Sequence, residues 1–155
     1  MDERSSLDIA HVAVRIATEL GVGDVAVSVR HNRFLELTQR DGTLEKIQES
    51  TSRGLSATLY HDGRYSSHST SDLGPEAVKQ FLTQAVALTA LLERDEHRRL
   101  PDPALYEGRS DADLELVDAG YDSVTVDQRK EMAAAMETAA HSDARVISAN
   151  ATVYD

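Results

Sequence analysis

Cysteine is absent from this chain of 155 residues, and long apolar runs are absent as well. Without cysteine the chain can form neither a disulfide framework nor a thiolate metal site, so nothing in it requires an oxidising compartment. No apolar run approaches the roughly 20 residues that cross a bilayer, and residues 1–20 lack the basic region and apolar block of a secretion signal. We therefore expect a cytoplasmic protein that does not insert into a membrane.

Positive charge is also scarce. The 16 lysines and arginines face 27 aspartates and glutamates, giving a net charge of −11. Such a chain repels polyanions and lacks the clustered basic residues that phosphate contacts need, so a nucleic-acid partner is not expected. The acidity is concentrated between Asp102 and Asp122, where seven carboxylates accompany Arg109 alone.

The stretch from Ser52 to Leu92 carries the clearest pattern. Leu55, Ala57 and Leu59 alternate with polar residues at the period of a strand. Asp62-Gly63 is a turn dipeptide, and residues 65–70 then return as a partner strand, which pairs position 57 with 68 and 60 with 65. Gly74 and Pro75 next predict the start of a helix whose apolar residues recur at intervals of three and four.

The flanking segments extend this pattern in both directions. An apolar stripe over 9–20 predicts a first helix, and Asp41-Gly42 predicts a hairpin between strands at 25–37 and 44–48. Thr125 and Gln128 form a capping box for another helix, and alternation over 146–154 predicts a terminal strand. The predicted fold class is α+β: a four-stranded antiparallel meander with helices on one face, then an extended acidic arm and a helix-strand fragment of a second unit.

The predicted domain organisation has three parts. Residues 1–94 form the α+β domain, 95–124 a linker without sustained periodicity, and 125–155 the beginning of a second domain. A terminal strand needs a ladder partner, so the simplest interpretation is that the chain is cut short inside the next sheet. The alternative is that the strand pairs back onto the N-terminal sheet.

The residues that could carry chemistry each have a simpler structural explanation. A two-residue turn places His61 and His68 too far apart in register to share a metal, and His68 is expected to pack beneath the helix. Asp111, Asp113 and Glu115 alternate like the opening of a calcium loop, but the glycine and the bidentate glutamate of such a loop are missing. We therefore predict no catalytic, cofactor-binding or metal-binding residue in this chain, and His97 is interpreted as part of a helix end.

Four short segments stand out along the chain: Arg53-Gly54 at the opening of a strand, Asp62-Gly63-Arg64 at the hairpin, residues 69–73 (STSDL) before the helix, and residues 101–106 (PDPALY) in the connection. Together they resemble the N-terminal domain of the TldD/PmbA family, the metalloprotease-related proteins also called modulators of DNA gyrase. The Pro-Asp-Pro arm is more similar to the PmbA (TldE) branch.

The resemblance implies a function that the residues alone do not. Family members with peptidase activity carry an HExxxH helix, in which two histidines bind zinc and the glutamate activates water. This chain has no such motif. The resemblance thus implies a non-catalytic part of a zinc metalloprotease assembly that processes unfolded or linear peptides. Zinc is expected only in the metal-bearing subunit, and the implied partners are a homologous subunit in a dimer and the peptide substrate. The alternative is a freestanding interaction module that acts by strand addition.

Overall fold

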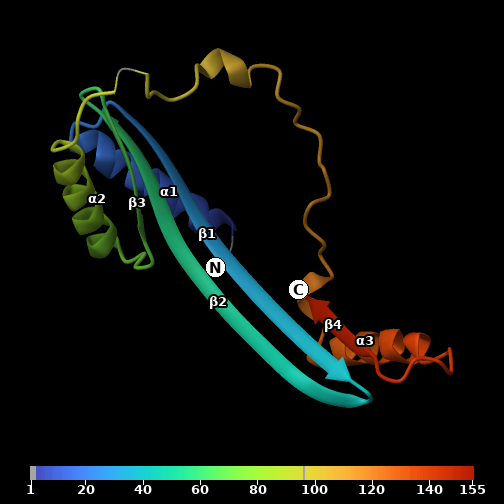
Figure 1. The fold of residues 1–155 in the computed structure, drawn as a ribbon. Coiled ribbons are helices and arrows are strands. Elements are labelled where there is room, and N and C mark those ends of the chain that lie inside the picture. The colour runs from blue at the N-terminus through green and yellow to red at the C-terminus, as the bar shows by residue number, and fades with distance from the viewer. Residues whose placement is uncertain (1–2, 96) are drawn as a thin grey trace. The chain divides into compact units, whose positions relative to one another are not determined.

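The computed structural model describes residues 3–95 and 97–155. The chain runs through α1 (Glu3–Glu19), β1 (Asp24–Arg40), β2 (Thr43–His61), β3 (Arg64–Thr70), α2 (Pro75–Thr89), α3 (Val126–Ala140) and β4 (Asn150–Tyr154), as Figure 1 shows. The strands form one sheet in the order β3-β2-β1-β4, in which β3 pairs antiparallel with β2 and β4 pairs antiparallel with β1. The predicted α+β class with a four-stranded antiparallel sheet is confirmed.

The make-up of the sheet differs from the predicted meander. The segments expected as two strands, 44–48 and 55–60, are parts of the single strand β2. The fourth strand is β4, which pairs with β1 from Glu36↔Tyr154 to Arg40↔Asn150. The terminal segment therefore pairs back onto the N-terminal sheet, as the alternative interpretation held.

The chain divides into two compact units that are both discontinuous in sequence. Unit 1 comprises residues 1–32 and 52–109, and unit 2 comprises residues 33–51 and 110–155. The long strands β1 and β2 each contribute one part to unit 1 and the other to unit 2.

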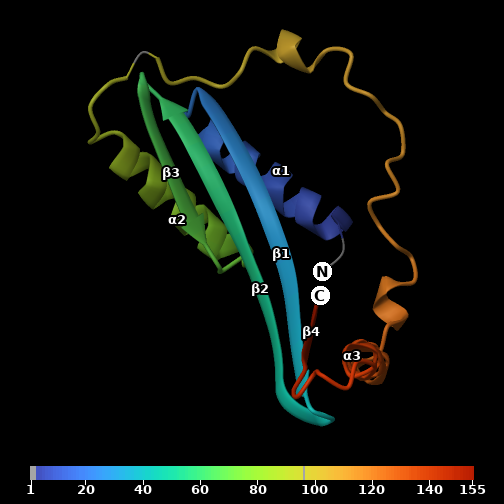
Figure 2. The same ribbon diagram turned by 45° about the vertical axis from the view of Figure 1, so that its right-hand side comes forward.

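The core of unit 1 lies between two helices and one face of the sheet. Buried residues of α1 and α2 pack on Leu55, Ala57 and Leu59 of β2, and these helical residues are Ala13, Ala17, Val78, Leu82 and Ala85. Since the three β2 residues alternate along one strand, both helices cover the same face, and Figure 2 shows them beside the strands. The predicted hairpin register is confirmed by the pairs Ala57↔His68 and Tyr60↔Tyr65.

Unit 2 has a smaller core beneath α3. Leu35 and Leu37 of β1 pack with Ala133 of α3 and Ala151 of β4, and Val126 and Val153 add to this cluster. The predicted capping box starts α3: the Thr125 hydroxyl accepts from the Gln128 amide at 3.2 Å, and the Thr125 amide donates to the Gln128 side chain at 2.7 Å.

The connection between α2 and α3 is extended. It contains two short 3₁₀ turns, Pro103–Tyr106 and Tyr121–Ser123, and its carboxylates between Asp102 and Asp122 are exposed. Among the described residues no helix has the length and apolar character needed to cross a membrane.

Candidate functional site

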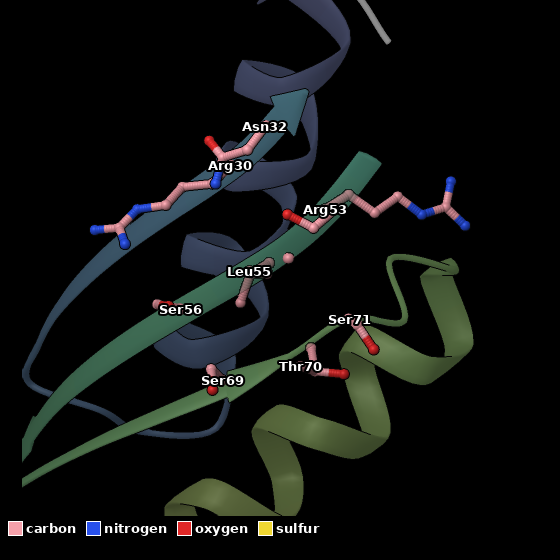
Figure 3. A pocket seen from close by; sticks show the side chains of 10 residues that line it. Arg30, Asn32, Arg53, Leu55, Ser56, Ser69, Thr70 and Ser71 are labelled. Atoms are coloured by element: carbon pink, nitrogen blue, oxygen red, sulfur yellow. The ribbon is translucent and has the colours of Figure 1, made fainter. Parts of the chain in front are cut away.

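The candidate binding site is a groove in unit 1, with a volume of about 430 Å³. Three strand segments line it: Arg30 and Asn32 of β1, residues 52–56 of β2, and residues 69–71 where β3 ends (Figure 3). Ser56 and Ser69 are directly paired across β2 and β3. Because neighbouring strand residues point to opposite faces, this pair lies on the face opposite Leu55 and the covering helices.

Small residues keep the groove open. Serine and threonine occupy five of the ten lining positions, and Gly54 occupies another. A Cβ at Gly54 would lie 3.1 Å from the carbonyl oxygen of Thr70, which is closer than nine in ten real Cβ contacts. The glycine therefore permits the close approach of β2 and β3 at this end of the hairpin.

Two arginines give the groove its charge. No carboxylate is among the lining residues, and neither Arg30 nor Arg53 forms an ion pair or side-chain hydrogen bond with another described residue. Figure 3 shows their guanidinium groups pointing in opposite directions, so they do not converge on a single anion. Hydroxyl and guanidinium donors spread along a groove suit an extended ligand with several acceptors.

A second group of polar residues meets in unit 2. Asp41, Glu137 and His141 each bring a possible metal-ligand atom within 4.8 Å of the others. Asp41 follows β1 in the hairpin turn, whereas Glu137 lies on α3 and His141 caps its C-terminus. Local spacing gave no signal for this cluster, because Asp41 and Glu137 are far apart in the sequence.

Hydrogen bonds within the protein already use both carboxylates of this cluster. Glu137, which is 4 % exposed, accepts from the amide of Gly42 at 3.0 and 3.1 Å and from the side chain of Gln39 at 2.7 Å. Asp41 accepts from the Ala149 amide at 3.0 Å and the Ser148 hydroxyl at 2.8 Å, and His141 Nε2 lies 3.4 Å from it. The hydrogen bonds that Asp41 accepts, first of all the one from the Ala149 amide, hold the pKa of the Asp41 carboxyl below its usual range. The cluster thus joins the hairpin turn to α3 and to the segment before β4.

The register of the second hairpin separates His61 from His68 as the sequence predicted. His68 is half-buried and contacts the Ser66 hydroxyl at 2.9 Å, and that hydroxyl contacts Thr89 of α2 at 2.5 Å. His61 pairs with Arg64 beside the turn. The prediction that His97 belongs to a helix end is wrong. The helix α2 ends at Thr89, and His97 lies in a turn beyond it.

The alternating acids of the arm do not converge. Asp113 accepts a hydrogen bond from the amide of Glu115, whose φ is 51°, and both residues are exposed together with Asp111. Among the described residues these three carboxylates form no group with metal-ligand spacing. The prediction that this chain has no catalytic, cofactor-binding or metal-binding residue stays a prediction.

Comparisons with known proteins agree on one family. Over 144 residues the chain is 28 % identical to the metalloprotease PmbA homolog of Haemophilus influenzae, covering 92 % of the chain and 31 % of that protein. A crystal structure described as a modulator of DNA gyrase from Bacteroides thetaiotaomicron is 32 % identical with a TM-score of 0.86, covering 99 % of this chain and 35 % of that one. The fold is also similar to that of TldE from Thermococcus kodakarensis, with a TM-score of 0.65 and 18 % sequence identity. This match covers 94 % of this chain and 33 % of the TldE chain.

The family model for PmbA/TldA metallopeptidase domain 1 matches residues 25–89. That range contains all of β1 except its first residue, the whole of β2, β3 and α2, and with them the groove. The chain spans about a third of the length of the relatives that it matches. Residues 25–89 therefore belong to the PmbA/TldD family as its first domain.

Proposed function

We propose that this chain is the non-catalytic N-terminal part of a PmbA/TldD-type zinc metalloprotease assembly that acts on unfolded or linear peptides. In this proposal a homologous subunit carries the zinc, the chain supplies peptide-binding surface, and the assembly works in the cytoplasm in proteolysis and peptide maturation. The family match supports the proposal, together with the absence of an HExxxH sequence from the chain.

The observation that carries the proposal is the chemistry of the groove. Its hydroxyls and its two arginines are donors that suit the carbonyl and carboxylate oxygens of an extended peptide. Among the residues that the structure describes, no histidine or carboxylate lines the groove, so its serines lack a neighbouring general base there. The donors of the groove thus support peptide binding as its role, with hydrolysis assigned to the metal-bearing subunit.

Fluorescence anisotropy with labelled, unstructured peptides tests this proposal. We expect acidic peptides to bind more tightly than basic peptides of equal length, and the binding to weaken as salt increases. Arg53→Glu should weaken binding, whereas the matched change Arg109→Glu, in the exposed arm, should leave it unaltered. Mass spectrometry of the same mixtures should show intact peptide unless the metal-bearing subunit is added. Chelator-sensitive cleavage by the chain alone would refute the proposal.

A second candidate function is strand addition to a partner, and one observation favours it. β4 pairs with β1 only from Glu36 to Arg40, and Leu35 exchanges backbone hydrogen bonds with Asp155. The earlier part of β1 has no strand on that side among the residues that the structure describes. Protection of β1 amides from hydrogen exchange that increases with protein concentration would support this function, and concentration-independent exchange would oppose it.

A further inference from the structure

The edge of β2 beyond the end of β3 leaves backbone hydrogen-bonding groups available in unit 1. The pairing of these two strands stops at Leu55↔Thr70, although β2 begins at Thr43. Among the described strands, none continues along the β3 side of residues 52–54. Such an edge can take up another extended chain, because its free amide and carbonyl groups repeat at the spacing of a strand.

Two side-chain hydrogen bonds turn the chain away from the sheet where β3 ends. The Thr70 hydroxyl accepts from the Asp72 amide at 3.2 Å, and the Asp72 carboxylate accepts from the Gly74 amide at 3.0 Å. Gly74 is the N-cap of α2, so these bonds lead the chain from β3 into the helix, and Figure 3 shows it leaving the line of β2. The groove lies where a longer β3 would run, because residues 52–54 and residues 69–71 both line it.

The two arginines of the groove lie on different faces of the sheet. Arg53 is two residues from the buried Leu55, so its side chain leaves β2 on the face that the helices cover further along the strand. Arg30 points in the opposite direction (Figure 3). An extended peptide beside β2 would direct neighbouring side chains to these same two faces in turn. Two arginines that do not converge on one anion are thus placed to meet two neighbouring side chains of one strand.

The charge of this edge selects the chains that can pair with it. Arg30 and Arg53 are exposed and form no ion pair with another described residue. None of the described residues that line the groove carries a carboxylate. A peptide with acidic side chains is therefore attracted to both arginines, whereas a basic peptide is repelled. The edge thus favours an acidic strand over the other extended chains that free backbone groups alone would accept.

From these observations we propose that the groove binds an extended acidic peptide by strand addition. The backbone of the peptide pairs with residues 52–54 of β2, and two neighbouring acidic side chains reach Arg53 and Arg30 on opposite faces of the sheet. This inference rests on the proposed peptide-binding function and adds to it the binding mode and the class of peptide. Backbone bonds require no particular sequence, so one site can hold many unfolded peptides, and the paired acids set the preference among them.

Backbone methylation of the ligand tests the pairing while the protein stays unaltered. The probe is a fluorescein-labelled hexapeptide with two neighbouring glutamates at its centre and alanines elsewhere. Only every second amide of an added strand faces β2, so N-methylation of single positions should weaken binding about tenfold at alternate amides and change it little at those between. Losses without this alternation, or no loss at any amide, would overturn strand addition and leave peptide binding standing. If the unmethylated probe does not bind, the proposed function itself fails, and this inference fails with it.

Charge exchange tests the placement of the two arginines. Arg53→Glu and Arg30→Glu should each weaken binding of the probe about tenfold, whereas Arg109→Glu in the exposed arm should leave it unaltered. All three side chains are exposed, so none of these changes should disturb the fold. Replacing one glutamate of the probe by lysine should restore binding to Arg53→Glu, and replacing the other glutamate should restore binding to Arg30→Glu. Rescue of both variants by the same peptide position, or of neither variant by either position, would overturn the proposed placement.

Discussion

Replacing Glu137 by alanine should loosen the hairpin turn of unit 2. The carboxylate is buried, and both of its oxygens accept from the Gly42 amide, while Oε2 also accepts from Gln39. Alanine removes these acceptors. The half-buried Gln39 side chain can turn to water, but the Gly42 amide is fixed by the turn, in which Asp41 and Gly42 have φ values of 47° and 76°. One donor that loses its acceptor in a partly buried position costs about 2 kcal/mol.

Hydrogen exchange followed by mass spectrometry measures this loss where it occurs. A cost of about 2 kcal/mol corresponds to roughly thirtyfold faster exchange in peptides that contain Gly42, provided exchange proceeds by local opening. Glu131→Ala is the control, because Glu131 is an exposed glutamate on the same helix. Equal exchange in the two variants would show that the Glu137 hydrogen bonds contribute nothing to the turn, and the structural role assigned to the cluster would be wrong.

Three further predictions concern stability. Leu59→Ala, at a fully buried position of β2, should lower the free energy of unfolding by about 3 kcal/mol in urea titrations, whereas Leu105→Ala, at a position 75 % exposed, should change it little. Thr125→Ala removes the side-chain cap of α3 and should cost about 1 kcal/mol, measured by the same titration; an unaltered midpoint would contradict the cap. Hydrogen bonds from Arg94, and then from Arg64, lower the pKa of the Asp62 carboxyl below 3.8 in the folded protein. The ionised carboxylate therefore stabilises the fold at pH values above its unfolded pKa, and this stabilisation is lost as the pH falls through the folded pKa. Acid titration should therefore show a fall in stability below about pH 4 that Asp62→Asn reduces.

The features that the sequence predicted best are those fixed by neighbouring residues. Asp62-Gly63 specified its turn because both residues adopt positive φ, at 50° and 70°, and the turn then set the register of β2 and β3. Gly74-Pro75 and the Thr125–Gln128 box marked where α2 and α3 begin, for reasons that lie within one helical turn.

The continuity of β2 could not be predicted in the same way. Residues 49–53 are polar and exposed, so they show no alternation of apolar and polar side chains. Hydrogen bonding to β1, rather than burial, keeps this part of the strand extended. Alternation of apolar and polar residues marks only the half-buried parts of a strand. The exposed middle of β2 lacks it, so the sequence predicted two strands where the structure has one.

Distance in the sequence explains why the unit 2 cluster escaped prediction. Asp41 and Ser148 are joined by a hydrogen bond of 2.8 Å, although 107 residues separate them. Their meeting depends on the pairing of β4 with β1, which the terminal strand's own alternation does not specify. The alternation identified a strand, and only the three-dimensional structure identified its partner.

Some polar side chains of this protein have hydrogen-bond partners within the fold, and others have none among the described residues. We use this difference to separate residues with a structural role from residues that could bind a ligand. The carboxylates of Asp41 and Glu137 accept hydrogen bonds from fixed donors, so an added cation would have to displace bonds that already stabilise the turn. Arg30 and Arg53 have no such partners among the described residues, and both line an open groove. Exposed charges cost little when alone, but they contribute to binding when a complementary surface reaches them. Peptide binding should therefore respond to changes at these two arginines and not to changes at Asp41 or Glu137.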